Sequence, residues 1–105
     1  MATVELKEQG WQTFSQAEYA VIDCYGDNCV VCVMLEPVYN GAADELNAVA
    51  FGRINITRYP DIAEKFGINA MPTPLHFRRG ELVNQAVGGM DCEQLLACLA
   101  VLLYQ

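Results

Sequence analysis

The chain has 105 residues, 53% of them apolar, and its 13 acidic and 6 basic residues give a net charge of −7. This length suffices for one compact domain, residues 1–105, and is too short for two. No apolar run approaches the roughly 20 residues of a membrane-spanning helix, and an acidic chain without a Lys/Arg stripe is excluded as a nucleic-acid binder.

The first part of the chain alternates between strand-like and helix-like segments. A short strand is predicted at residues 3–6 ("TVEL"), and the polar segment at 10–17 ("GWQTFSQA") is compatible with a helix. Residues 19–25 ("YAVIDCY") are β-branched and aromatic, which is typical of a strand. Because residues 1–10 lack both a basic start and an apolar run, no secretory signal is expected and the cytoplasm is favoured.

A long helix is predicted after this strand, from Cys29 to about Val49. Pro37 lies inside it and is expected to bend it rather than end it. The prediction rests on apolar residues at helical spacing, which are Val30, Met34, Val38 and Ala42.

The second part of the chain continues the alternation. Residues 51–56 ("FGRINI") are predicted to form a strand, and residues 60–67 a short helix with Pro near its start and Gly past its end. Residues 74–88 are predicted to form two strands joined at "RRGE", and a leucine-rich helix with Asp91 as its N-cap is predicted to follow.

The resulting order, β-α-β-α-β-α-β-β-α, indicates an α/β fold. Strands separated by helices favour a parallel arrangement with helices on both faces of the sheet, whereas the last two strands are adjacent and favour an antiparallel hairpin. No repeat and no Pro/Gly/Ser linker interrupts the order, which agrees with one domain.

Two cysteines, Cys29 and Cys32, lie where the second strand passes into the long helix. A C-x-x-C pair can bind zinc or an iron–sulfur cluster, form a redox couple, or be two buried thiols. The unpaired N–H groups and the positive dipole end of a helix N-terminus stabilise a thiolate, so the pKa of Cys29 is expected to lie below the ordinary value of about 8.5. A zinc site within one chain lacks ligands, because there is no second C-x-x-C and His76 is the single histidine, although a metal shared by two chains stays possible.

Asp23 shares one face of its strand with Val21 and Tyr25, by the two-residue period of a strand. A carboxyl group there is expected to be partly buried, which raises its pKa and suits it to accept a proton. The alternative is a solvated acid at a strand end. Cys24 points to the opposite face and is expected to pack in the core.

These residues resemble the thioredoxin family over nearly the whole chain. "VIDCYGDNCVVC" is similar to the family's strand, buried acid and redox motif, "GRINITRYPDIAEKFGI" to its third strand and helix, "MPTPLHF" to its cis-proline loop and "FRRGELVNQAVGG" to its final hairpin. The resemblance implies the thioredoxin fold, a central mixed five-stranded sheet with four flanking helices.

The resemblance also implies roles for single residues. Cys29 is similar to the family's attacking thiol, Cys32 to its resolving thiol, and Asp23 to its buried carboxylate. Pro72 falls on the cis-proline, so the resemblance implies that the substrate-binding residues are Met71, Pro72, Thr73, Gly88 and Asn28. Arg53 stands where the family often has a lysine, and its permanent charge can hold Asp23 ionised.

The motif also departs from the family pattern. Asn28 replaces a tryptophan, Val30 and Val31 replace Gly-Pro, and Val33 replaces a lysine. Exchange chemistry needs the two sulfur atoms and their geometry, so these changes bear on the reduction potential and on the choice of partners.

The function that the resemblance implies is thiol-disulfide exchange: a Cys29/Cys32 couple that reduces protein disulfides, needs no cofactor and is re-reduced by a thioredoxin-reductase-type donor. A monomer without membrane or nucleic-acid partners is expected. Two alternatives stay open, an interaction module that binds one partner without turnover and a metal-binding protein using the same cysteines.

Cys92 and Cys98 are not expected to form a disulfide with each other, because they lie about 9 Å apart along one helix and on different sides of it.

Overall fold

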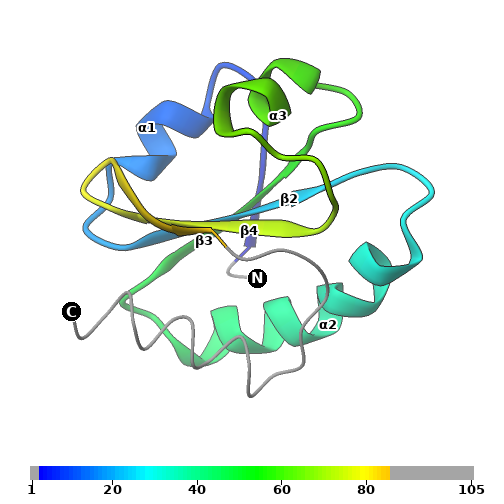
Figure 1. The fold of residues 1–105 in the computed structure, drawn as a ribbon. Helices are drawn as coiled ribbons and strands as arrows, with labels where there is room; N and C mark the ends of the chain where they lie inside the picture. The colour runs from blue at the N-terminus through cyan, green and yellow to red at the C-terminus, as the bar shows by residue number, and fades with distance from the viewer. Residues whose placement is uncertain (1–2, 86–105) are drawn as a thin grey trace.

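The structure, a computed structural model, describes residues 3–85, whose five strands form one mixed sheet (Figure 1). Three strands run parallel in the spatial order β1 (Thr3–Leu6), β3 (Ala50–Asn55) and β2 (Ala20–Tyr25). β4 (Thr73–Arg78) pairs antiparallel with β2, and β5 (Glu81–Gln85) pairs antiparallel with β4. The mixed five-stranded sheet and the parallel arrangement expected from the element order are thereby confirmed.

Helices cover both faces of the sheet. α1 (Trp11–Ser15) and α3 (Pro60–Phe66) lie on one face, and α2 (Val30–Glu45) lies on the other, as Figure 1 shows. The fourth predicted helix, which begins at Asp91, lies outside the described residues. Among residues 3–85, no helix is long and apolar enough to cross a membrane.

The central strand β2 supplies side chains to both cores by alternation. Ile22 and Cys24 pack with Trp11 in the core under α1 and α3, whereas Val21 packs with Tyr39 in the core under α2. Five of the six β2 residues are buried, as expected of a strand covered on both faces. Asp23 follows the same alternation and therefore faces α2, as Val21 does.

The long helix differs from its prediction in its end and in its buried face. It stops at Glu45 instead of about Val49, because Ala50 already pairs in β3. Val30 and Met34 are 72% and 67% exposed. A row of residues four apart turns by about 40° per step around an α-helix, so Val30 and Ala42 do not share a face. The buried residues of α2 are Cys32, Leu35, Tyr39, Ala42 and Ala43.

The ends of α3 and the turn between β4 and β5 lie where the sequence predicts them. α3 begins with Pro60 and ends at Phe66, and the next residue, Gly67, caps the helix with a left-handed φ of 64°. In the hairpin between β4 and β5, Arg79 and Gly80 both have positive φ, which is the geometry of the tight turn that matches the twist of paired strands. The predicted junction at "RRGE" is therefore confirmed.

Candidate active site

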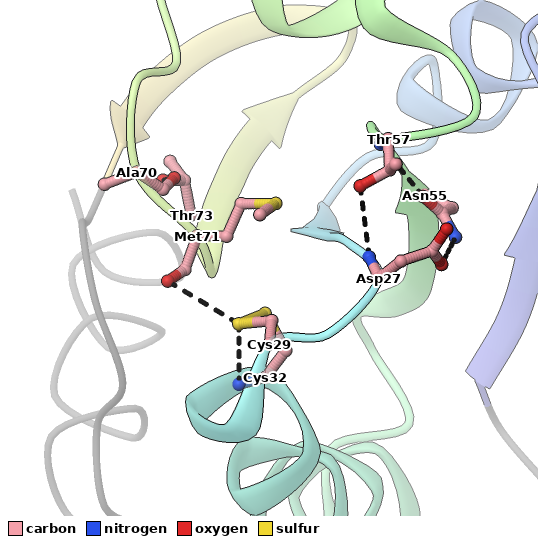
Figure 2. Close-up of a disulfide and its surroundings, with 8 residues drawn as sticks. All are labelled: Asp27, Cys29, Cys32, Asn55, Thr57, Ala70, Met71 and Thr73. Carbon is pink, nitrogen blue, oxygen red and sulfur yellow. Dashed lines mark hydrogen bonds between the residues drawn. A yellow bond between two sulfur atoms is a disulfide. The ribbon is translucent and has the colours of Figure 1, made fainter.

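Cys29 is the N-cap residue of α2, and its sulfur atom faces the open end of the helix. Its backbone is extended, and its Sγ accepts a hydrogen bond from the Cys32 backbone N–H at 3.2 Å (Figure 2). Cys29 and Cys32 are joined as a disulfide with a Cα–Cα distance of 5.2 Å. The same N–H group can donate to a thiolate at Cys29 after reduction, which favours attack by this sulfur atom.

Cys29 and Cys32 differ in their exposure to solvent. Cys32 is 3% exposed because it lies on the buried face of α2, whereas Cys29 is partly exposed. A disulfide of another molecule can therefore reach Cys29 more readily than Cys32. This inequality is what a scheme with one attacking and one resolving thiol requires.

The loop before β4 lies against the disulfide. The Met71–Pro72 peptide bond is cis, in agreement with the geometry that the resemblance implies, and Cys29 Sγ lies 3.9 Å from the Met71 carbonyl oxygen (Figure 2). The Thr73 hydroxyl donates a hydrogen bond to the Ala70 carbonyl at 2.8 Å. Thr73 is buried, so its hydroxyl holds the loop together, and the substrate contact implied for it stays a prediction.

Three polar residues that the sequence reasoning missed hold the loop before Cys29. The Asp27 backbone N–H donates to Thr57 Oγ1 at 3.0 Å, and the Asn55 side-chain amide donates to Asp27 Oδ1 at 3.0 Å (Figure 2). Asn55 Oδ1 in turn accepts from the Thr57 N–H at 2.9 Å. The signal in the sequence is polar residues at the ends of two strands, because the carboxyl ends of neighbouring parallel strands meet at one sheet edge.

Gly26 and Asn28 give this loop its shape. A Cβ added at Gly26 would fall 2.6 Å from Thr57 Oγ1 and closer still to Met71 Sδ, so a side chain at this position would force the Thr57 and Met71 side chains to move. Asn28 has a φ of 56°, a left-handed conformation that asparagine tolerates better than most residues. This backbone requirement is a local reason for asparagine before Cys29, where the family usually has tryptophan.

Asp23 is a buried carboxyl group on β2, the strand that precedes the pair. It is 3% exposed, and its Oδ1 has no hydrogen-bond partner among the described residues. Its burial raises the pKa to about 7, and the nearby Arg53 opposes this shift. The expected partial burial of Asp23 is confirmed. Arg53 lowers the pKa of Asp23, in the direction that its permanent charge suggested, but desolvation has the larger effect.

The other predicted residues are placed as follows. Cys24 is fully buried in the core, as expected, and burial raises the pKa of its thiol. His76 is fully buried in β4. Gly88, Cys92 and Cys98 lie outside the described residues. Within residues 3–85, no group of three or more His, Cys, Asp or Glu side chains is arranged to hold a metal ion.

An apolar surface surrounds the pair. Val30, Val31, Val33 and Met34, on the first turns of α2, are 72%, 44%, 66% and 67% exposed. A hollow of about 290 Å³ next to Met71 is lined in part by Ile56 and Ile68. The disulfide therefore lies at the start of a helix with exposed valines, and its neighbour Met71 also lines this hollow.

Comparisons of the sequence with known proteins identify one family. The thioredoxin family model matches residues 2–101. A thioredoxin from Chlamydia caviae is 31% identical over 88 residues, which cover 84% of this chain and 86% of that protein. A thioredoxin from Mycoplasma pneumoniae is 32% identical over 85 residues, which cover 81% of this chain and 82% of that protein.

Solved structures agree with these sequence matches. A thioredoxin from Malassezia sympodialis superposes with a TM-score of 0.84 at 26% identity, covering 96% of this chain and 90% of that one. A mutant thioredoxin from Halobacterium salinarum superposes with a TM-score of 0.90 at 24% identity, covering 98% of this chain and 92% of that one, and supports the fold alone.

Proposed function

Since the chain belongs to the thioredoxin family and is a thiol-disulfide oxidoreductase, we propose that it reduces protein disulfides with Cys29 as nucleophile and Cys32 as resolving thiol. The observation that carries this assignment is the unequal exposure of the two cysteine residues at the start of α2. Cys29 is partly exposed and accepts the Cys32 N–H, while Cys32 is 3% exposed.

In the first step, the Cys29 thiolate attacks one sulfur atom of a substrate disulfide. A Cys29–substrate disulfide forms, the substrate S–S bond breaks, and the other substrate sulfur leaves as a thiolate that takes a proton from water. The backbone of Met71 is well placed to align an extended substrate segment, because its carbonyl oxygen lies 3.9 Å from Cys29 Sγ.

In the second step, Cys32 gives its proton to the Asp23 carboxylate and attacks Cys29 Sγ. The Cys29–substrate bond breaks, the Cys29–Cys32 disulfide forms, and the second substrate thiolate leaves and is protonated by water. The substrate gains two electrons and the chain loses two. A carboxyl group whose pKa is about 7 suits this step, since it is substantially ionised at neutral pH and can still hold the proton.

The partners of the family are, in general, protein substrates and a reductase-type electron donor. For this chain we propose a thioredoxin-reductase-type donor, a monomer as the working form, and the cytoplasm as the compartment. The cytoplasmic proposal rests on the reducing conditions there, which keep a dithiol such as Cys29 and Cys32 reduced.

The proposal is tested by comparing Cys32→Ser with Cys29→Ser. Cys32→Ser should attack disulfides and stall as a mixed disulfide, because serine cannot displace sulfur at neutral pH, whereas Cys29→Ser should trap few partners. The readout is a non-reducing gel of tagged variants from cells, with bands that vanish on adding dithiothreitol, alongside insulin reduction by the unmodified chain. Equal trapping by both variants, or none together with no insulin reduction, would support a binding module instead.

A further inference from the structure

Arg53 of β3 is held by side chains from three other elements. Its Nε lies 3.5 Å from Glu5 Oε1 of β1, and its Nη1 lies 3.4 Å from Glu36 Oε1 of α2. Its guanidinium carbon lies 4.0 Å from the centre of the Tyr25 ring of β2. Glu5, Tyr25 and Glu36 are called the Arg53 clamp below.

Two members of the clamp, Tyr25 and Glu5, also contact each other. The Tyr25 hydroxyl donates a hydrogen bond to Glu5 Oε2 at 2.6 Å, so the two oxygen atoms of Glu5 engage Arg53 and Tyr25 separately. An arginine side chain loses rotamer entropy when it is ordered. Contacts on several sides offset this cost, and they hold the guanidinium in one place.

That place is beside Asp23. Asp23 and Arg53 are register partners on the parallel strands β2 and β3, and the Arg53 side chain is 21% exposed. The charged and titratable groups that interact with Asp23 come from β3, β1, α2 and β2 itself, and they are Arg53, Glu5, Glu36, Tyr39 and Cys24. On the β4 side its register partner is Pro74, and the buried His76 is two residues further along that strand.

Arg53 is the one group among these that favours an ionised Asp23, because both glutamates disfavour it. The attraction energy between a cation and a carboxylate falls in inverse proportion to their separation. A guanidinium that moves out into water is also screened by salt, over about 10 Å. Two of the clamp members are themselves acids that oppose ionisation of Asp23. Their net effect on Asp23 therefore depends on how well they fix Arg53.

We propose that Glu5, Tyr25 and Glu36 are positioning residues for the resolving step, which hold the Arg53 guanidinium beside Asp23 so that its carboxylate is available to take the Cys32 proton. The inference rests on the proposed role of Asp23. Arg53 and its clamp touch neither the substrate nor the two sulfur atoms. They act through Asp23 alone, on the step in which Cys32 displaces the substrate from Cys29.

Tyr25 allows a test in which no formal charge changes at neutral pH. The titration midpoint of Asp23 is followed by carbon NMR of its carboxyl group in the full reduced chain. Arg53→Met should raise the midpoint by about 1 pH unit or more, as expected when a neighbouring opposite charge is lost. Arg53→Lys should restore part of it. Tyr25→Leu should also raise the midpoint, because Arg53 loses its stacking surface and Glu5 loses a partner.

A double substitution separates positioning from a change in burial. Tyr25→Leu should have no upward effect in the Arg53→Met background, where no cation remains to be released. Tyr25→Phe, which keeps the ring and loses only the bond to Glu5, should give a smaller rise and serves if Tyr25→Leu does not fold. Tyr19→Leu is the matched control, because Tyr19 has an arginine, Arg78, 6.0 Å from its ring centre and is not a clamp residue.

The kinetic readout is stopped-flow release of thionitrobenzoate from the reduced chain treated with Ellman's reagent. Attack by Cys29 releases the first equivalent, displacement by Cys32 releases the second, and Cys32→Ser marks the second phase by losing it. A rise of about 1 pH unit in the midpoint leaves about tenfold less carboxylate at pH 6, so Tyr25→Leu should slow the second phase by about that factor there and little above pH 9.

Each outcome has a definite meaning. The proposal is overturned if Tyr25→Leu leaves the Asp23 midpoint unchanged, or raises it equally with and without Arg53. If Asp23→Asn leaves the second phase unchanged while the NMR shifts occur, the clamp positions Arg53 as described, but the proposed proton acceptor is wrong. The failure of this inference and the failure of the proposed mechanism are thus distinguishable.

Discussion

Asp23 and His76 are two buried ionisable residues whose effects on stability oppose each other. Burial raises the pKa of Asp23 from 3.8 to about 7 and lowers the pKa of His76 from 6.5 to about 4. Both shifts favour the neutral form, which for the acid is protonated and for the histidine is unprotonated. Between pH 4 and 6.5 the two contributions to the free energy of unfolding therefore change in opposite directions.

Asp23→Asn should stabilise the chain at alkaline pH far more than at acid pH. Because the folded pKa is raised, the contribution of Asp23 is fully present below pH 3.8 and is lost as the pH rises through about 7. A difference of about 3 pH units at about 1.4 kcal/mol each corresponds to about 4 kcal/mol. Urea unfolding at pH 4 and pH 8 measures it, and an equal effect of the substitution at both pH values would contradict the raised pKa.

His76→Leu should show the opposite dependence on pH. The folded pKa of His76 is lowered, so its contribution is present above pH 6.5 and is lost as the pH falls through about 4. This loss amounts to about 3 kcal/mol, and the stability of His76→Leu relative to the unmodified chain should improve by that amount from pH 7 to pH 4. The double variant with Asp23→Asn serves as control and should vary least with pH, while a pH-independent effect of His76→Leu would argue against a buried neutral imidazole.

At the scale of elements, the site is made where three segments meet. The loop after β2 carries Gly26 and Asp27, the end of β3 supplies Asn55 and Thr57, and the loop before β4 brings Met71 to Cys29. The hydrogen bonds of Asp27 with Asn55 and Thr57 join residues 28 and 30 positions apart in the chain. The placement of the helix start relative to the Met71 loop therefore depends on a few small or polar residues.

Gly26→Ala should impair disulfide reduction without unfolding the chain. The added Cβ collides with Thr57 Oγ1, which accepts the Asp27 N–H, and with the end of the Met71 side chain, so the Met71 side chain must turn aside and the loop before Cys29 must shift. We expect kcat/KM for insulin reduction to fall by about tenfold, which corresponds to ~1.4 kcal/mol of lost substrate alignment.

Gly41→Ala in α2 is the matched control for this change. It has nothing within 4 Å of its added Cβ, and it should stabilise the helix by about 0.5–1 kcal/mol with activity unchanged. Full activity of Gly26→Ala, or equal losses in the two variants, would show that the close approach of Gly26 to Thr57 and Met71 does not matter for disulfide reduction.

At the scale of the molecule, the surface around the pair combines exposed aliphatic side chains with a net charge of −7. Val30 and Val31 are β-branched residues where the family usually has Gly-Pro, and Val33 stands in place of a lysine. A reductase shaped for the usual motif meets a different outline and one fewer positive charge. Partner choice is a difference of affinities, so such changes should narrow it.

A generic thioredoxin reductase should therefore reduce this chain poorly, while its cognate reductase does so well. We expect a difference of about tenfold or more in kcat/KM, and Val30→Gly combined with Val31→Pro should recover part of it with the generic enzyme. The measurement is reductase-coupled cofactor oxidation with each enzyme. Equal efficiency of both reductases with the unmodified chain would remove the argument.

Local signals along the chain were enough to predict the order of elements through β5 and the place of the cysteine pair. Period-two alternation in residues 20–25, the C-x-x-C at a strand–helix junction and the Gly at residue 67 are local signals, because each depends on backbone geometry within a few residues. The same alternation placed Asp23 on the face that became buried. The cysteine pair and the buried acid could thus be predicted from the sequence without the structure.

Tertiary structure alone decided what surrounds them. α2 ends at Glu45 because Ala50 pairs with the sheet as the first residue of β3. Val30 and Met34 are exposed because another face of the helix packs against the sheet. The contacts of Arg53 with Glu5 and Glu36 join three elements that are far apart in the chain. The balance between burial and charge that brings the pKa of Asp23 to about 7 is a sum over such neighbours, and no local pattern of residues encodes their distances.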